Sequence, residues 1–277
     1  MKNKIDSVSL KVKNLLSLSN YYETVIGLVI KKQTTKEVWL GAEGNDEILL
    51  HLIEVPNATK AYNKTGMYHL ALTVPNRQVL GSFLVHVIDH SEFSGTADHG
   101  YSEAIYLEDP EYNGIEVYCD KPISAWDIRD NGKIYGVTEP LDYYKLIEEA
   151  SEFTKLPAST ILGHIHLNVA DLETTKTFYR DILQMSLKAD FAKTAKFFAY
   201  DEYHHHVGAN IWRGADMPPM TETDMGLDSF TIALNKETYT VVKQNLTNQN
   251  IIFDEGKNTL QFIDPSGIKI IVKKVLK

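Results

Sequence analysis

The first half of the sequence recurs in the second half at a nearly constant offset, and this repeat constrains the fold more than any other feature. Tyr22, in a Tyr-Tyr-Glu stretch, corresponds to Tyr179, in a Phe-Tyr-Arg stretch, 157 positions later. Similar stretches at residues 109–117 and 264–272 close the two halves at an offset of 155. The chain is therefore expected to contain two copies of one structural unit.

Each half divides again into two modules. Residues 66–74 and 226–234 resemble the stretches that open the two halves, so four openings follow one another along the chain. Polar and apolar residues alternate over residues 7–12, which predicts a strand. In the second half, apolar residues at helical spacing follow the opening strand, and Asp171 stands where a helix N-cap is expected. Short apolar runs complete each module, so the sequence predicts an α+β fold of four βαβββ modules.

The segment between the halves departs from the repeat. We expect residues 1–122 to form a first domain of two modules and residues 161–277 to form a second, joined by a linker over residues 123–160. Apolar residues at helical spacing predict a connecting amphipathic helix over residues 141–153 of this linker.

Composition narrows the class of protein. Of the 277 residues, 43% are hydrophobic and 23% are charged, which is typical of soluble globular proteins. Lys and Arg number 28 against 37 Asp and Glu, and the resulting net charge of −9 argues against a nucleic-acid or anionic-membrane partner. The single cysteine, Cys119, excludes an internal disulfide. We expect a cytoplasmic protein with a small-molecule ligand, and a homodimer stays open.

Two motifs carry a resemblance to a known family. Val-Ala-Asp-Leu at 169–172, followed by Phe-Tyr-Arg-Asp-Ile-Leu at 178–183, and Asp-Pro-Glu-Tyr-Asn-Gly-Ile-Glu at 109–116 resemble the vicinal oxygen chelate superfamily. That superfamily includes glyoxalase I, extradiol ring-cleaving dioxygenases and antibiotic-resistance proteins. The stretch at 203–212 is similar to four-module bacterial proteins of the catechol-2,3-dioxygenase-like group. The resemblance implies modules paired into two cupped, incompletely closed β-barrel domains, with metal ligands on their opening and closing strands.

The second half retains only part of the ligand set that the resemblance implies. Extradiol dioxygenases of this type carry two histidines and a glutamate in the second half. His164 matches the first position, but Ser229 and Ile271 stand at the other two. Isoleucine has no donor atom, so we do not expect the usual second-half metal site.

The first half offers another candidate set. His69 and Glu116 match the opening and closing strands of the second module, and His51 lies in the closing strand of the first. Two histidines and one carboxylate suit Fe(II), our first expectation, or Mn(II). Alternatively, Glu116 is a surface carboxylate and His51 an inward-facing polar group.

Five histidines cluster in two short stretches of the second half. His164 and His166 lie two residues apart and should share one face of a strand. The same alternation places His206 on one face of its strand and His205 on the other. The sequence thus predicts three catalytic histidines, His164, His166 and His206, around a common cavity. The expected substrate-pocket residues share this neighbourhood: Tyr203, His204 and Asn210. Alternatively, these histidines are structural and hydrogen-bonded within the strands.

Three functions stay open. The first is a metal-dependent extradiol-type dioxygenase that cleaves a catechol or hydroquinone-like aromatic, with His166 or His206 handling a proton. The second is a non-catalytic binding or resistance protein that sequesters a small aromatic or electrophilic compound. The third is a glyoxalase-type lyase or isomerase, with a carboxylate base such as Glu116.

Overall fold

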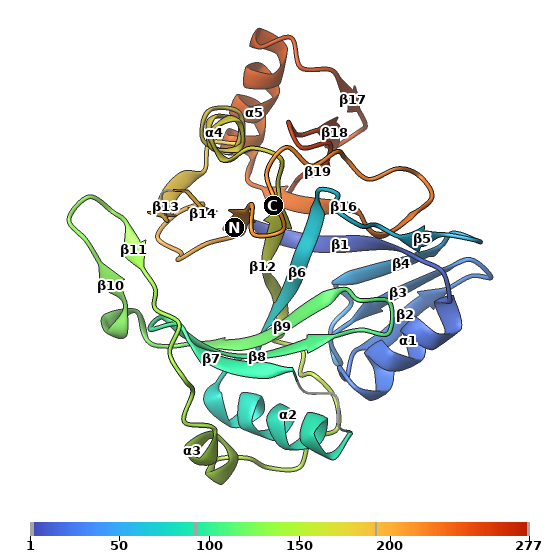
Figure 1. The fold of residues 1–277 in the computed structure, drawn as a ribbon, viewed down its shortest axis with the longest axis vertical. Helices are drawn as coiled ribbons and strands as arrows, with labels where there is room; N and C mark the ends of the chain where they lie inside the picture. The colour runs from blue at the N-terminus through green and yellow to red at the C-terminus, as the bar shows by residue number, and fades with distance from the viewer. Residues whose placement is uncertain (1–2, 91–93, 192, 276–277) are drawn as a thin grey trace.

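The computed structural model describes residues 3–90, 94–191 and 193–275, and it confirms the predicted α+β fold. Two large curled sheets dominate the described chain, and their central strands meet in the middle of the molecule (Figure 1). Each sheet contains two βαβββ modules joined edge to edge, so the four predicted modules form two open cups.

The first sheet is built from the first and fourth modules. Its strands, in spatial order, are β17 (Phe253–Glu255), β18 (Thr259–Ile263), β19 (Lys269–Lys274), β16 (Asp224–Leu234), β1 (Lys4–Val12), β4 (Leu50–Glu54), β3 (Glu37–Gly41) and β2 (Val29–Gln33), with β5 (Thr59–Lys60) beside β16.

The second sheet is built from the second and third modules. Its strands, in spatial order, are β13 (Ser186–Asp190), β14 (Ala195–Ala199), β15 (Val207–Asn210), β12 (Ile161–Asn168), β6 (Gly66–Thr73), β9 (Gly114–Asp120), β8 (Ser102–Glu108) and β7 (Gly95–Asp98).

The modules pair crosswise between the halves of the chain. The opening strands β1 and β16 run antiparallel at the centre of the first sheet, and β6 and β12 do so in the second. The pairing expected from the sequence joins both modules of each cup within one half, over 1–122 or 161–277. The structure departs from that pairing because the similarity of the four opening strands identifies the modules but does not specify which of these strands pair.

The register of the central strands follows the sequence repeat. His166 of β12 pairs with His69 of β6, and Ser9 of β1, 157 positions before His166, pairs with Ser229 of β16. The offset therefore brings equivalent strands into equivalent places, as the repeat predicted.

Four helices follow the opening strands, and each begins after an Asn or Asp whose side chain accepts a hydrogen bond from the first turn. The predicted cap, Asp171, is one of these four. The helices are α1 (Leu15–Thr24), α2 (Arg77–Asp89), α4 (Leu172–Thr177), which continues as the π-helical turn η2 (Phe178–Ile182), and α5 (Lys236–Asn248).

The linker contains less helix than its sequence predicts. It comprises the 3₁₀ turn η1 (Ile123–Ala125), the hairpin strands β10 (Asp127–Ile128) and β11 (Ile134–Tyr135), and α3 (Tyr143–Glu148). The helix stops short of residue 153 because the backbone N–H of Ser151 donates to the Ser82 hydroxyl on α2, 2.8 Å away, and not to a helical carbonyl. Close packing of α3 on α2 uses Gly81, where a Cβ would collide with the carbonyl of Leu146.

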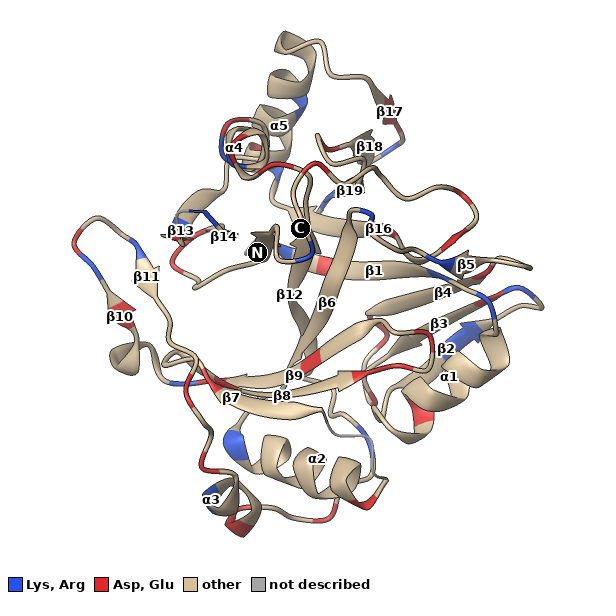
Figure 2. Ribbon diagram, viewed as in Figure 1, with Lys and Arg blue, Asp and Glu red and all other residues tan. Residues whose placement is uncertain are grey.

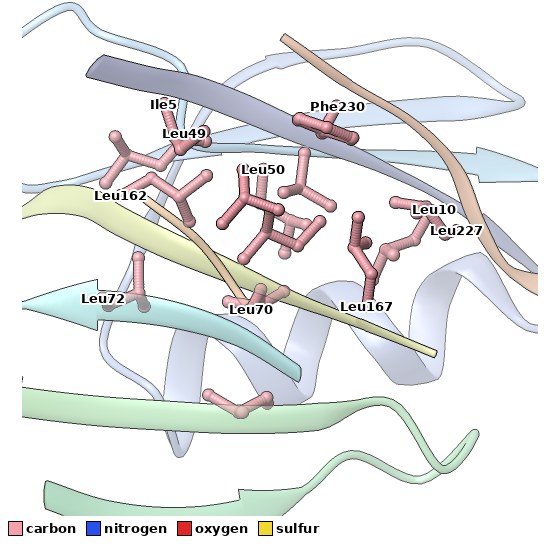
Figure 3. Close-up of a cluster of buried hydrophobic side chains, with 14 of the residues drawn as sticks. Ile5, Leu10, Leu49, Leu50, Leu70, Leu72, Leu162, Leu167, Leu227 and Phe230 are labelled. Atoms are coloured by element: carbon pink, nitrogen blue, oxygen red, sulfur yellow. The ribbon is translucent and has the colours of Figure 1, made fainter. Parts of the chain in front are cut away.

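The hydrophobic core lies between the central strands of the two sheets. Figure 3 shows Leu10 and Phe230 of the first sheet facing Leu70 and Leu167 of the second. Because alternate strand residues point to opposite faces, side chains on the other face of β12 are left to line the cup of the second sheet.

Charged residues are distributed over the loops, helices and hairpin. In the view of Figure 2, acidic and basic segments are interspersed, in keeping with a net charge of −9. Among the described residues, no helix is both long and apolar enough to cross a membrane.

Candidate metal centre

Three central strands of the second sheet bring together two histidines and a glutamate. His69 lies on β6, which runs between β9, carrying Glu116, and β12, carrying His164. Ala71 of β6 pairs with both Glu116 and His164, so these two side chains lie level with each other on either side of β6. The site therefore follows directly from the register of three adjacent strands.

The three side chains converge closely. Glu116 Oε2 lies 3.0 Å from His69 Nε2 and 3.3 Å from His164 Nε2. The two Nε2 atoms lie 3.4 Å apart, and one donor atom from each residue falls within 4.8 Å of the other two. All three residues are buried, with exposed fractions of 6% or less. Three donor atoms thus face one point away from solvent.

Electrostatics keep the group in a form that binds cations. Burial alone would raise the pKa of Glu116, but the adjacent imidazoles of His164 and His69 hold it well below its ordinary value. Burial lowers the pKa of His164 to about 4, against the opposing pull of Glu116. An ionised carboxylate beside a neutral imidazole is the protonation state that metal binding requires.

The donor set fits a divalent transition metal. His69 Nε2, His164 Nε2 and one Glu116 oxygen supply three potential ligand atoms that lie within 4.8 Å of one another. A two-histidine, one-carboxylate set that leaves coordination positions open is typical of non-haem Fe(II) sites. The residues present therefore suit the metal that the fold family implies.

A cavity of about 730 Å³ opens over the three residues. His166 and His205 line it beside the candidate ligands, and residues 136–138 of the linker form part of its wall. Its aromatic lining comes from both modules of the sheet: Tyr68, Tyr101, Tyr106, Phe191, Phe197 and Trp212. Such a cavity can hold a flat ring against the metal group.

His51 does not belong to this centre, which corrects the ligand set proposed from sequence. It lies on β4 of the other sheet, where its ring stacks on Trp39 at 4.5 Å and its Nε2 lies 3.5 Å from Glu37. The crosswise pairing of modules is the reason, since β4 and β9 close different cups. His164 lies in the place expected for His51, so the candidate centre draws on both halves of the chain.

The structure also reverses the expected orientations of His205 and His206. His205 lines the cavity, whereas His206 turns away and its Nδ1 accepts a hydrogen bond from the Tyr200 N–H at 3.2 Å. Strand alternation does not apply here because β15 begins only at Val207. Burial lowers the pKa of both imidazoles, that of His206 to about 3.

Three residues predicted to line a substrate pocket lie behind the cavity wall. Tyr203 and His204 both contact Asp120, through hydrogen bonds of 3.0 Å and 2.9 Å. Asn210 is fully buried, and its Oδ1 accepts from the Trp212 N–H at 3.0 Å. These residues support the cavity rather than line it.

Tyr106 and His99 also line the cavity, and neither was among the site residues predicted from the sequence. The Tyr106 hydroxyl lies 2.6 Å from His99 Nε2, and His99 Nδ1 lies 2.8 Å from the Val137 carbonyl of the linker. Burial and the Glu116 carboxylate raise the pKa of Tyr106. A signal existed, because Tyr106 pairs with Glu116 across the hairpin of β8 and β9.

Known proteins resemble this chain in sequence and in fold. The family model described as Glyoxalase/Bleomycin resistance protein/Dioxygenase superfamily matches residues 4–117 and 161–272. A protein of Bacillus subtilis (strain 168) named Catechol-2,3-dioxygenase is 37% identical over 267 residues, covering 94% of this chain and 93% of its own.

Solved structures share the fold at low sequence identity. Glyoxalase I from Zea mays has a TM-score of 0.61 and 13% identity, with 98% of this chain and 92% of that chain covered. The cppA protein from Streptococcus pneumoniae TIGR4 has a TM-score of 0.59 and 14% identity, with 99% and 100% covered.

Proposed function

Because this chain belongs to the glyoxalase/bleomycin resistance protein/dioxygenase superfamily, we propose that it is a metal-dependent extradiol-type dioxygenase acting on a catechol or hydroquinone-like aromatic. The observation that carries the proposal is the buried His69–Glu116–His164 group at the floor of an aromatic-lined cavity. The name of the 37% identical relative supports it.

The metal would be held by His69, Glu116 and His164, with Fe(II) as the first choice and Mn(II) as the second. When bound, it would supply open coordination positions for two adjacent oxygens of the substrate and for O₂. Glu116 contributes the negative charge that makes the set selective for a cation, and burial lowers the pKa of His164 to about 4, which keeps its imidazole neutral at pH 7.

His166 is the residue we propose to handle the substrate proton. It lines the cavity, is 3% exposed, and its buried Nε2 has no hydrogen-bond partner among the described residues. Burial and the neighbouring imidazoles of His69 and His164 lower its pKa, so at neutral pH the ring is uncharged. An uncharged imidazole can accept a proton from a phenolic hydroxyl and return it later in the reaction.

The surrounding rings orient the substrate. The ring of Trp212 lies 5.0 Å from that of His166 and 5.1 Å from that of Tyr68, edge to face in both cases. A catechol between such rings would present its edge, and hence its hydroxyl groups, to the floor of the cavity.

Oxygen uptake by the Fe(II)-reconstituted protein tests the proposal. With catechol we expect O₂ consumption matched one to one by a coloured ring-opened product, whose spectrum reports cleavage beside the two hydroxyl groups. His164→Ala should abolish both signals, and His51→Ala should retain them, since His51 lies in the other sheet.

Two other outcomes would contradict the dioxygenase. Isomerisation of a thiol–ketoaldehyde adduct without O₂ uptake would establish the glyoxalase-type activity. Tight binding of aromatics by metal-free and metal-loaded protein alike, with no turnover, would establish the sequestering protein.

A further inference from the structure

A chain of three polar side chains leads from the C-terminal end of β9 to the cavity. Asp120, at the end of β9, accepts a hydrogen bond from His204 Nε2 at 2.9 Å, and His204 Nδ1 lies 2.7 Å from His205 Nδ1. Asp120 is partly exposed, the His204 side chain is fully buried, and His205 lines the cavity. We propose that Asp120 and His204 fix His205 as the tautomer whose Nε2 accepts a hydrogen bond, so that the cavity selects ligands bearing a hydroxyl group.

The direction of the hydrogen bonds follows from the carboxylate. An ionised carboxylate only accepts, so the proton on His204 sits at Nε2 and its Nδ1 carries a lone pair. His205 must then donate from Nδ1 to His204, which leaves its own Nε2 unprotonated. Within the described residues no hydrogen bond is made by His205 Nε2, and the side chain borders the cavity.

Aromatic contacts hold this chain in one geometry. The Tyr101 ring stacks on His204 at 4.3 Å with an interplanar angle of 10°, and Trp126 meets the same ring edge-on at 5.2 Å. Tyr203 donates to the second oxygen of Asp120 at 3.0 Å and lies 2.6 Å from the Tyr118 hydroxyl.

Gly163 makes room for this arrangement. A Cβ at this position would collide with the hydroxyl of Tyr118, so any other residue would displace the tyrosine pair that supports Asp120. The close approach of the Tyr118 hydroxyl accounts for this glycine.

An acceptor fixed beside the metal group discriminates between ligands. The His205 ring lies 4.1 Å from the His164 ring and 4.9 Å from that of Phe197, so a ligand on the cavity floor meets its edge. A ligand hydroxyl can donate to Nε2, whereas a methyl ether at that place leaves the buried acceptor unpaired. The inference rests on the proposed function only for the identity of the natural ligand.

The substitution Asp120→Asn inverts the chain without changing its shape. The amide oxygen can still accept from Tyr203, which turns the amide N–H toward His204 Nε2. His204 must then protonate Nδ1 and donate to His205 Nδ1, so the proton of His205 moves to Nε2. Asp98→Asn is the matched control, because Asp98 has a similar exposed fraction, 26% against 30%, but pairs with Lys121 and no histidine.

Histidine side-chain NMR on metal-free protein reads the tautomers directly. We expect His205 protonated at Nδ1 in the native protein and in Asp98→Asn, and at Nε2 in Asp120→Asn. A native His205 protonated at Nε2, or the same tautomer in all three proteins, would overturn the proposal.

Phenol and anisole, titrated into the same metal-free samples, test the selectivity. The native protein should bind phenol about tenfold more tightly than anisole, a ratio that corresponds to one satisfied buried acceptor. In Asp120→Asn this preference should disappear. Equal affinities in the native protein, or no measurable binding of either probe, would overturn the selectivity. Because neither measurement needs metal or turnover, a failure of the dioxygenase activity would leave the tautomer result standing.

Discussion

The two sheets of this protein have the same strand register but different chemistry. Ala71 pairs with both His164 and Glu116 in the second sheet, and Thr231 pairs with both Ser7 and Ile271 in the first. The positions that carry two histidines and a glutamate in one cup therefore carry two serines and an isoleucine in the other. Identical backbone geometry holds a candidate metal centre only where the donor atoms are present.

The two cups also differ in how far their central side chains are exposed to solvent. His164 and His166 are 2% and 3% exposed, whereas their equivalents Ser7 and Ser9 are only half-buried. The linker accounts for part of this difference, since residues 136–138 close over the second sheet. Desolvation strengthens electrostatic interactions, so the covered cup favours metal binding more than the open one does.

The largest expected effect is the loss of metal from one cup alone. Glu116→Gln keeps the shape but removes the negative charge, so we expect metal affinity to fall by at least about 100-fold. Ile271→Gln, at the equivalent position of the first sheet, should leave metal content unchanged. Elemental analysis after reconstitution with Fe(II) measures both. Retained metal in Glu116→Gln would show that the ion lies elsewhere.

A second prediction transfers the donor set to the other cup. The triple variant Ser7→His, Ser229→His, Ile271→Glu should bind a second divalent ion per chain, because the register already places these positions together. We expect its affinity to be about 10–100-fold weaker than the native site, since the surrounding hydrogen bonds were not built for it. Calorimetric titration with Mn(II) counts the sites. A stoichiometry that stays at one would show that register alone is insufficient.

A third prediction concerns the pH dependence that the buried histidines create. The pKa of His206 is about 3 in the folded protein and about 6.5 in an unfolded chain, so the unfolded state takes up the proton first. The stability that neutral His206 contributes is therefore complete above pH 6.5 and is lost as the pH falls toward 3.

Urea denaturation of metal-free protein between pH 7 and 4 measures this loss. His206→Asn keeps an acceptor for the Tyr200 N–H, and it should reduce the decline in unfolding free energy by about 1.4 kcal/mol per pH unit below 6.5. His51→Asn in the first sheet should change the decline less, because His51 is only half-buried. Equal slopes for native protein and His206→Asn would contradict the buried, neutral assignment.

The sequence was sufficient to predict the modules and their equivalence, but not their partners. The Tyr22–Tyr179 offset carries over to the strand register because both are set by the same repeat. The opening strands are similar in sequence, so no local pattern predicts that β6 pairs with β12 rather than with β1. That choice decides whether His51 or His164 joins His69 and Glu116.

Local structure limited the rest of the site prediction. Alternation orders His164 and His166 correctly because both lie within a long strand. It fails for His205 and His206 because these residues precede β15 in an irregular segment, where His206 accepts from the Tyr200 N–H and His205 contacts His204, which bonds Asp120. Asp120 lies 84 positions from His204 in the sequence, so no local pattern reveals this contact.

The smallest expected effect separates two otherwise equivalent tyrosines. Tyr22 donates to Asp109 Oδ2 at 2.9 Å, and Tyr179 donates to Asp264 Oδ2 at 3.1 Å. Asp109 Oδ2 also accepts from the Asn113 side chain, whereas Asp264 Oδ2 has no other donor among the described residues. Removing the hydroxyl should therefore cost more at Tyr179 than at Tyr22.

Tyr22→Phe and Tyr179→Phe make this difference measurable by denaturation. We expect a loss of about 1 kcal/mol for Tyr22→Phe and about 2 kcal/mol for Tyr179→Phe at pH 8, because only the second leaves a buried oxygen unpaired. Burial raises the pKa of Asp264 to about 6, so the folded state favours the protonated carboxyl group. The stability that this group contributes is therefore complete at low pH and declines as the pH rises through 6. The Tyr179 hydroxyl supports the charged form, and its removal should therefore cost less at pH 5 than at pH 8. Equal losses for both variants at both pH values would show that the two halves are energetically, as well as topologically, the same.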